Sequence, residues 1–160
     1  STRVQPPGRG GRVRSPGVRA STTDGNAELA WVGVSTGQDD VSSATAQGML
    51  ARFSESEVRG MGRDAGGVIG IRLLKKEGDE VVSMSVVQPG ADLLVLSETG
   101  YGKRVPIEDF RVKHRGGQGV RLIRLDGRKT GVVAAVQQVT ALDEELVLTS
   151  GPGQGVRAEL

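Results

Sequence analysis

"HRGGQGVRLIRL", residues 114–125, is the segment from which the architecture can be predicted, because an earlier part of the chain repeats it. Residues 62–73, which lie 52 positions upstream, read "GRDAGGVIGIRL" and share six of its residues. Extending the comparison without a gap aligns residues 40–73 with residues 92–125, and ten of the 34 positions are identical. A fixed internal period of this size is typical of solenoids, repeat arrays and propellers.

Within one period the sequence predicts several short strands joined by glycine turns. Strands are expected where β-branched and leucine residues cluster, namely at 81–87, 93–97, 102–106 and 120–125, and the strand expected at 132–139 begins the next unit. The turn "ETGY" separates the second strand from the third, and "IEDF" at 107–110 is expected to form a single helical turn. Four strands for each repeat of about fifty residues indicate a propeller blade. The predicted class is therefore all-β, a propeller-like disc of four-stranded blades that repeat about every 52 residues.

The period also divides the chain into units. Residues 1–27 are predicted to be the second half of a blade, and residues 28–78 and 79–131 a blade each. Residues 132–160 would then be the start of a further blade. Because such a chain begins and ends within a repeat, we expect it to be a piece of a longer protein.

Composition supports short strands over long helices. Glycine accounts for 25 of the 160 residues, and the aromatic residues are Trp31, Phe53, Tyr101 and Phe110. A core must therefore come mainly from aliphatic side chains, and Trp31, which aligns with Val133 in a strand, is expected to join it. The absence of cysteine fits a reducing cytoplasm, and no apolar run reaches the roughly 20 residues that a membrane span needs. We expect a cytoplasmic protein that does not contact membranes.

Positive charge is concentrated in parts of the chain. The net charge is only +2, but residues 1–20 carry five arginines and no acid. Residues 99–125 hold seven Lys and Arg residues against two acids. Local basic patches of this kind attract a polyanion even when the total charge is small.

Cations at matched repeat positions, with their basic neighbours, are the candidate contacts to such a polyanion. They are Arg52, Arg59, Arg63, Arg72, Lys103, Arg104, Arg111, Lys113, His114, Arg115, Arg121 and Arg124. If each repeat is one blade, equivalent arginines fall at equivalent places around the disc and form a row that suits DNA phosphates. The alternative is that these are solvated strand-edge charges that prevent aggregation. Of the two arginines in residues 120–125, only Arg124 has a counterpart one repeat earlier, Arg72, so it ranks above Arg121.

Other chemistries have weaker support. A phosphate-binding loop needs Ser or Thr after Gly-Lys and then a helix. Gly102 and Lys103 are instead followed by Arg104 and a predicted strand. His114 is the only histidine, which leaves no histidine cluster for zinc. The carboxylates at 39–40 and 143–145 are expected to cap turns, with a metal site as the less favoured alternative. Few aromatic residues also argue against single-stranded nucleic acid, which needs stacking platforms.

Three stretches together resemble a known repeat. "LVLSETGYGKRVPIEDF" (94–110), "HRGGQGV" (114–120) and "GVVAAVQQV" (131–139) are similar to the repeat in the C-terminal domain of the bacterial DNA gyrase A protein. Topoisomerase IV shares this repeat in the corresponding protein. The resemblance implies a β-pinwheel, a disc whose blades exchange strands with their neighbours and whose basic rim bends duplex DNA.

The same resemblance implies a function. The chain would bind, bend and wrap duplex DNA without base specificity, as part of the A subunit of a type IIA topoisomerase that changes supercoiling with ATP. It would carry no catalytic site and no cofactor of its own, since the active-site tyrosine belongs to another region and is not Tyr101. ATP and Mg²⁺ would be handled by the rest of an A2B2 complex, which includes the B subunit, near the bacterial nucleoid.

Two alternatives stay open. The gyrase-defining heptad is matched by "KHRGGQG" (113–119) at four of seven places, so the parent could be gyrase or topoisomerase IV. The rival from another class is a propeller that only scaffolds protein partners. Duplex binding that weakens steeply with salt would distinguish a DNA-wrapping domain from such a scaffold.

Overall fold

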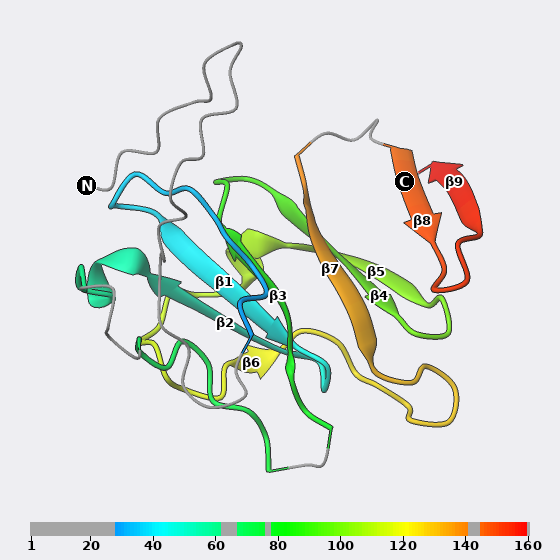
Figure 1. Cartoon of the computed structure of the whole chain (residues 1–160), viewed down its shortest axis with the longest axis horizontal. Helices are drawn as coiled ribbons and strands as arrows, with labels where there is room; N and C mark the ends of the chain where they lie inside the picture. The colour runs from blue at the N-terminus through cyan, green and yellow to red at the C-terminus, as the bar shows by residue number, and fades with distance from the viewer. Residues whose placement is uncertain (1–27, 62–66, 76–77, 141–144, 160) are drawn as a thin grey trace, which may run out of the picture.

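The computed structural model describes residues 28–61, 67–75, 78–140 and 145–159. These residues form nine β-strands and two short 3₁₀ turns, with every strand pair antiparallel (Figure 1). The predicted all-β class is therefore confirmed. A search of the described residues finds no helix that is long and apolar enough to cross a membrane.

The first sheet takes two of its four strands from the following predicted unit, residues 79–131. Its order is β3 (Val81–Val86), β1 (Asp40–Thr45), β2 (Met49–Ser54) and β6 (Val120–Arg121). In the β6 pairing Leu50 lies opposite Val120, 70 positions later in the chain. The sheet of the first unit is therefore completed by two strands of the second, which is a strand exchange between neighbours.

The second sheet and the last hairpin reproduce the first sheet in part. The second sheet has the order β5 (Gly102–Pro106), β4 (Asp92–Ser97) and β7 (Val133–Val139). β8 (Glu145–Thr149) and β9 (Gly155–Glu159) pair as a hairpin. β4, β5 and β7 therefore stand where β1, β2 and β3 stand one repeat earlier. Hydrogen bonds join β3 to β1 across residue 78, where the sequence period divides two predicted units.

A 3₁₀ turn follows the second strand of each of the first two hairpins. η1 (Glu55–Glu57) follows β2, and η2 (Ile107–Asp109) follows β5, which confirms the helical turn predicted at 107–110. Ser54 caps η1, because its hydroxyl oxygen accepts the backbone N–H of Ser56. These turns lead the chain out of each hairpin into the loops that carry many of the cations.

The core lies between the two larger sheets. Its most buried large side chains are aliphatic and come from both repeats: Leu50, Leu93, Val95, Ile107, Leu122 and Val133. Because Leu122 follows β6 directly, the exchanged strand brings a core residue of the second repeat against the first. One continuous core therefore joins the sheets.

Two sequence predictions are wrong. The strand predicted at 120–125 is only two residues long, because β2 begins at Met49 and Gly48 beyond it is already in the turn. Leu122 instead donates its backbone N–H to the carbonyl of Gly48. Trp31 is not core, since it is 38% exposed and lies in no strand. Its aligned residue Val133 is held in β7 by pairing with β4, and no described strand pairs with Trp31 in that way.

Candidate nucleic-acid interface

Four cations of the second repeat line one shallow depression. Lys103 lies in β5 and Arg121 in β6, while Arg111 and Lys113 come from the loop that connects η2 to β6. The floor is formed by apolar side chains, and Asp109 is the one acidic residue in the lining. Strand exchange creates this arrangement, because β6 brings Arg121 back beside the loop that precedes it.

The same four side chains are exposed and have no other role in the described structure. None of them has a hydrogen-bond or ion-pair partner among the described residues. Cations that are not used internally are available to phosphate oxygens. We call Lys103, Arg111, Lys113 and Arg121 the basic patch.

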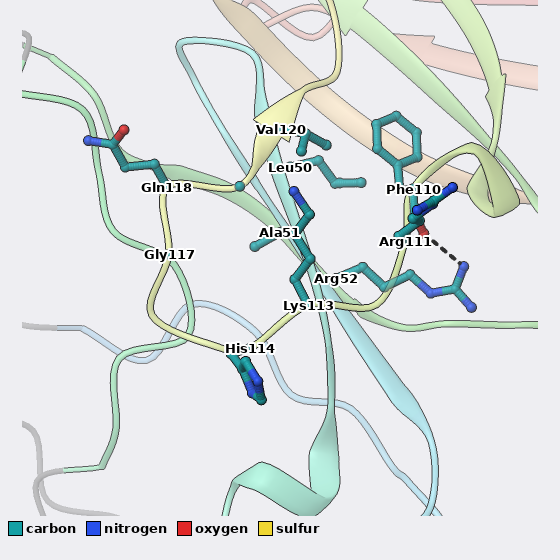
Figure 2. A pocket seen from close by; sticks show the side chains of 11 residues that line it. Leu50, Ala51, Arg52, Phe110, Arg111, Lys113, His114, Gly117, Gln118 and Val120 are labelled. Atoms are coloured by element: carbon teal, nitrogen blue, oxygen red, sulfur yellow. Dashed lines mark hydrogen bonds between the residues drawn. The ribbon is translucent and has the colours of Figure 1, made fainter.

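A groove beside β2 continues from this depression. Figure 2 shows the loop from Phe110 to Val120 running along β2, with Arg111, Lys113 and His114 on its way. The backbone N–H of Lys113 donates to the carbonyl of Arg52 at 2.8 Å, which fixes the start of the loop. At the other end Gly119 has a φ of +74°, and a Cβ atom there would lie 2.3 Å from the carbonyl oxygen of Leu50. Only glycine fits this close approach.

The first repeat holds the middle of this loop. The backbone N–H of Arg115 donates to Oε2 of Glu57 at 3.1 Å, and Nε of Arg115 donates to the carbonyl of Glu57 at 3.1 Å. Nδ1 of His114 lies 3.2 Å from Oε1 of the same carboxylate. Gly116 adds a backbone bond of 2.7 Å to the carbonyl of Gly70. Arg115 is therefore largely used within the protein, whereas the ring of His114 is fully exposed.

Arg52 is also used inside the protein. Its guanidinium contacts the carboxylate of Asp40 at 2.9 Å and that of Glu108 at 3.3 Å. It also donates to the carbonyls of Ile107 and Phe110, and the latter bond is drawn in Figure 2. With 11% of its side chain exposed, Arg52 links the first hairpin to η2 of the next repeat. The Arg52 guanidinium therefore stabilises the contact between two repeats.

The arginine equivalent to Arg52 pairs with an acid in every described hairpin. Arg104 donates to Asp92 at 2.6 Å, and Arg157 pairs with Glu145. In each hairpin the acid opens the first strand, and the arginine lies 12 positions later on the second strand. The recurrence of this arginine therefore has a structural cause. Asp40 and Glu145, predicted to cap turns, begin strands instead.

The other predicted residues lie apart from the basic patch lining. Arg59, Arg72 and Arg124 are exposed, and Arg72 contributes its backbone N–H to the carbonyl of Gly117 at 2.8 Å. Arg63 falls outside the described residues. The structure thus brings together a subset of the predicted cations, and it divides those that it describes into exposed side chains and side chains that hold the fold.

Sequence reasoning missed the acids of η1. Glu57 anchors the loop of the next repeat, and its neighbour Glu55 accepts the backbone N–H of Asp39 at 2.7 Å. Hydrogen bonds from the Ser35 side chain and the Asp39 backbone lower the pKa of Glu55. The sequence does contain a repeated acid at this position, because Asp109 stands 52 positions after Glu57. Within the described ranges no group of three or more metal-ligating side chains is found.

The arrangement defines a class of protein: a strand-exchanging, propeller-like repeat with a basic patch at the junction of two repeats. Comparison with known proteins agrees. The family model for the DNA gyrase C-terminal domain, beta-propeller, matches residues 39–88 and 91–140, together more than half of the chain. The chain therefore belongs to the family of DNA gyrase C-terminal domains, found in A subunits of type IIA topoisomerases.

Individual relatives support this assignment. The A subunit of DNA gyrase from Deinococcus deserti is 44% identical over 144 residues, which is 87% of this chain and 17% of the relative. The A subunit of DNA gyrase from Staphylococcus aureus is 36% identical over 151 residues, which is 93% of this chain and 17% of the relative. The chain spans less than a fifth of these curated relatives.

Solved structures share the fold. A DNA gyrase A C-terminal domain superimposes with a TM-score of 0.75 at 26% identity, covering 89% of this chain and 48% of that one. The C-terminal domain of a DNA topoisomerase IV gives a TM-score of 0.59 at 21% identity, covering 67% of this chain and 32% of that one. The second likeness concerns the fold alone. The β-pinwheel expected from the sequence is the fold of this family.

Proposed function

We propose that this chain binds duplex DNA without reading its base sequence, and that it bends the duplex along its basic face. The basic patch carries the proposal, because Lys103, Arg111, Lys113 and Arg121 are exposed, unpaired within the described structure and gathered around one depression. Duplex DNA carries a charge about every 1.7 Å of its axis, and neutralising its phosphates releases counterions whatever the sequence.

The patch suits phosphates better than bases. Long, flexible side chains around a shallow apolar floor can follow a sugar–phosphate backbone, whereas base readout needs an element that enters a groove. The described residues contain no α-helix that could enter a groove. Bending 20 to 30 base pairs costs on the order of 1 to 6 kcal/mol, which several phosphate contacts can offset.

In the intact protein we propose that this domain presents a bent DNA segment to the rest of the A subunit. The A subunit would work with a B subunit in an A2B2 complex that uses ATP and Mg²⁺ to change supercoiling, with the cleaving tyrosine outside this chain. Support comes from family membership and from relatives that are gyrase A subunits. We further propose that the protein acts in the bacterial cytoplasm at the nucleoid.

Fluorescence anisotropy tests the proposal on this chain. Two labelled 30-base-pair duplexes of unrelated sequence are titrated across a salt series, with end-to-end energy transfer reporting bending. We expect similar Kd values for both duplexes, a steep loss of affinity with salt, and shortening of the bound duplex. Absence of binding at low salt would overturn the proposal and favour a propeller that scaffolds proteins. A large preference for one duplex would overturn the sequence independence.

A further inference from the structure

We infer that Glu57 is a positioning residue for DNA binding: an acid of one repeat that holds the cation-bearing loop of the next. This inference rests on the proposed function. Its unusual consequence is that truncating an acidic side chain beside a DNA-binding surface weakens binding, although the loss of its negative charge alone predicts the opposite.

The geometry shows how the loop is held. Oε2 of Glu57 accepts the backbone N–H of Arg115, and Oε1 lies 3.2 Å from Nδ1 of His114. Lys113 is fixed separately, through its backbone bond to Arg52. The loop is therefore tied to β2 at Lys113 and to η1 at Arg115. Two members of the basic patch, Arg111 and Lys113, lie at or just before the first of these two attachment points.

Charge alone does not explain these contacts. Glu57 is half-buried, with 29% of its side chain exposed, and both of its oxygens are turned toward the following repeat. Its backbone carbonyl also accepts a hydrogen bond from Nε of Arg115. Nη1 of the same arginine donates to the carbonyl of Ile69 at 3.2 Å. Four acceptor contacts from the first repeat thus converge on two consecutive residues of the second. The loop is therefore held at a junction between repeats, directly after Lys113 of the basic patch.

Asp109 provides the contrast. It occupies the position equivalent to Glu57 one repeat later, but it lines the depression among the four cations. It is exposed and has no hydrogen-bond or ion-pair partner among the residues that the structure describes. Removing its charge should therefore show what the loss of an acid near the patch does by electrostatics alone.

The experiment compares Glu57→Ala, Glu57→Gln and Asp109→Asn in this chain. The first two remove the same charge, but glutamine keeps an oxygen for the Arg115 N–H and an amide for Nδ1 of a neutral His114. Duplex Kd is measured by anisotropy at fixed salt, and amide hydrogen exchange of Arg115 is measured by NMR. The exchange rate reports the position of the loop without any DNA.

We expect Glu57→Ala to bind at least about threefold more weakly than Glu57→Gln, with faster exchange at Arg115. Glu57→Gln and Asp109→Asn should both bind more tightly than the unmodified chain, because each removes a negative charge near the patch and leaves the loop held. Equal affinity of the two Glu57 variants, or unchanged exchange in Glu57→Ala, would overturn the inference. If the unmodified chain binds no duplex, the proposed function fails instead, while Arg115 exchange still reports whether Glu57 holds the loop.

Discussion

At the scale of single residues, a recurring cation has two separable explanations. Arg52 and Arg104 recur one period apart, and each pairs with an acid 12 positions before it. Lys103 and Arg121 do not recur, yet they are exposed and unpaired in the described structure. A sequence period shows that positions are equivalent, but it does not show what each side chain contacts. Recurrence alone does not separate framework from surface, because Arg59 and Arg111, which also stand one period apart, are both exposed.

The framework role of Arg52 predicts a loss of stability. Arg52→Gln should lower the free energy of unfolding by about 2 to 4 kcal/mol, because Asp40 loses its partner and two backbone carbonyls lose a donor in a largely buried place. Arg157→Gln is the matched control, since its pair with Glu145 is exposed and should cost less than about 1 kcal/mol. Urea denaturation followed by circular dichroism measures both. Equal losses would contradict the framework role.

At the scale of elements, the sequence predicts the hairpins, but it does not predict which strand β6 pairs with or how short β6 is. Strands at 81–87, 93–97 and 132–139 show as runs of β-branched and leucine residues between glycine turns, and the structure has strands there. The pairing of β6 with β2 joins segments 70 positions apart, which no local pattern reveals. Its short length follows from its partner, because β2 begins at Met49. The partner and the length of β6 are therefore set by tertiary contacts and not by its local sequence.

The close approach of Gly119 to β2 predicts that two glycines at equivalent repeat positions differ in how much stability an alanine substitution costs. Gly119→Ala should cost at least about 3 kcal/mol, because a Cβ atom would meet the Leu50 carbonyl and φ is positive. Gly67→Ala, one repeat earlier, has a similar φ of +78° but nothing within 4 Å, so it should cost only about 1 kcal/mol. Thermal unfolding of the two variants provides the comparison. A Gly67→Ala loss as large as that of Gly119→Ala would show that backbone conformation, not close packing, requires the glycine.

At the scale of the whole molecule, the basic patch is a product of strand exchange. Three of its members come from β5 and the loop after η2, and β6 returns Arg121 to them while the chain pairs with the first repeat. The repeat, the all-β class and the family were accessible from the sequence, because they depend on period and motif. The subset of cations that converge was not, because convergence depends on which repeat each strand joins.

The most direct test of the central claim is the salt dependence of duplex binding in a patch variant. Arg111→Gln combined with Arg121→Gln should reduce the slope of log K against log salt by about 2, since each phosphate contact contributes about 0.9. Lys75→Gln combined with Arg128→Gln removes the same charge from exposed residues outside the patch lining, and it should leave the slope nearly unchanged. If both double variants lower the slope equally, the cations act only through net charge, and a DNA-binding site at the basic patch is contradicted.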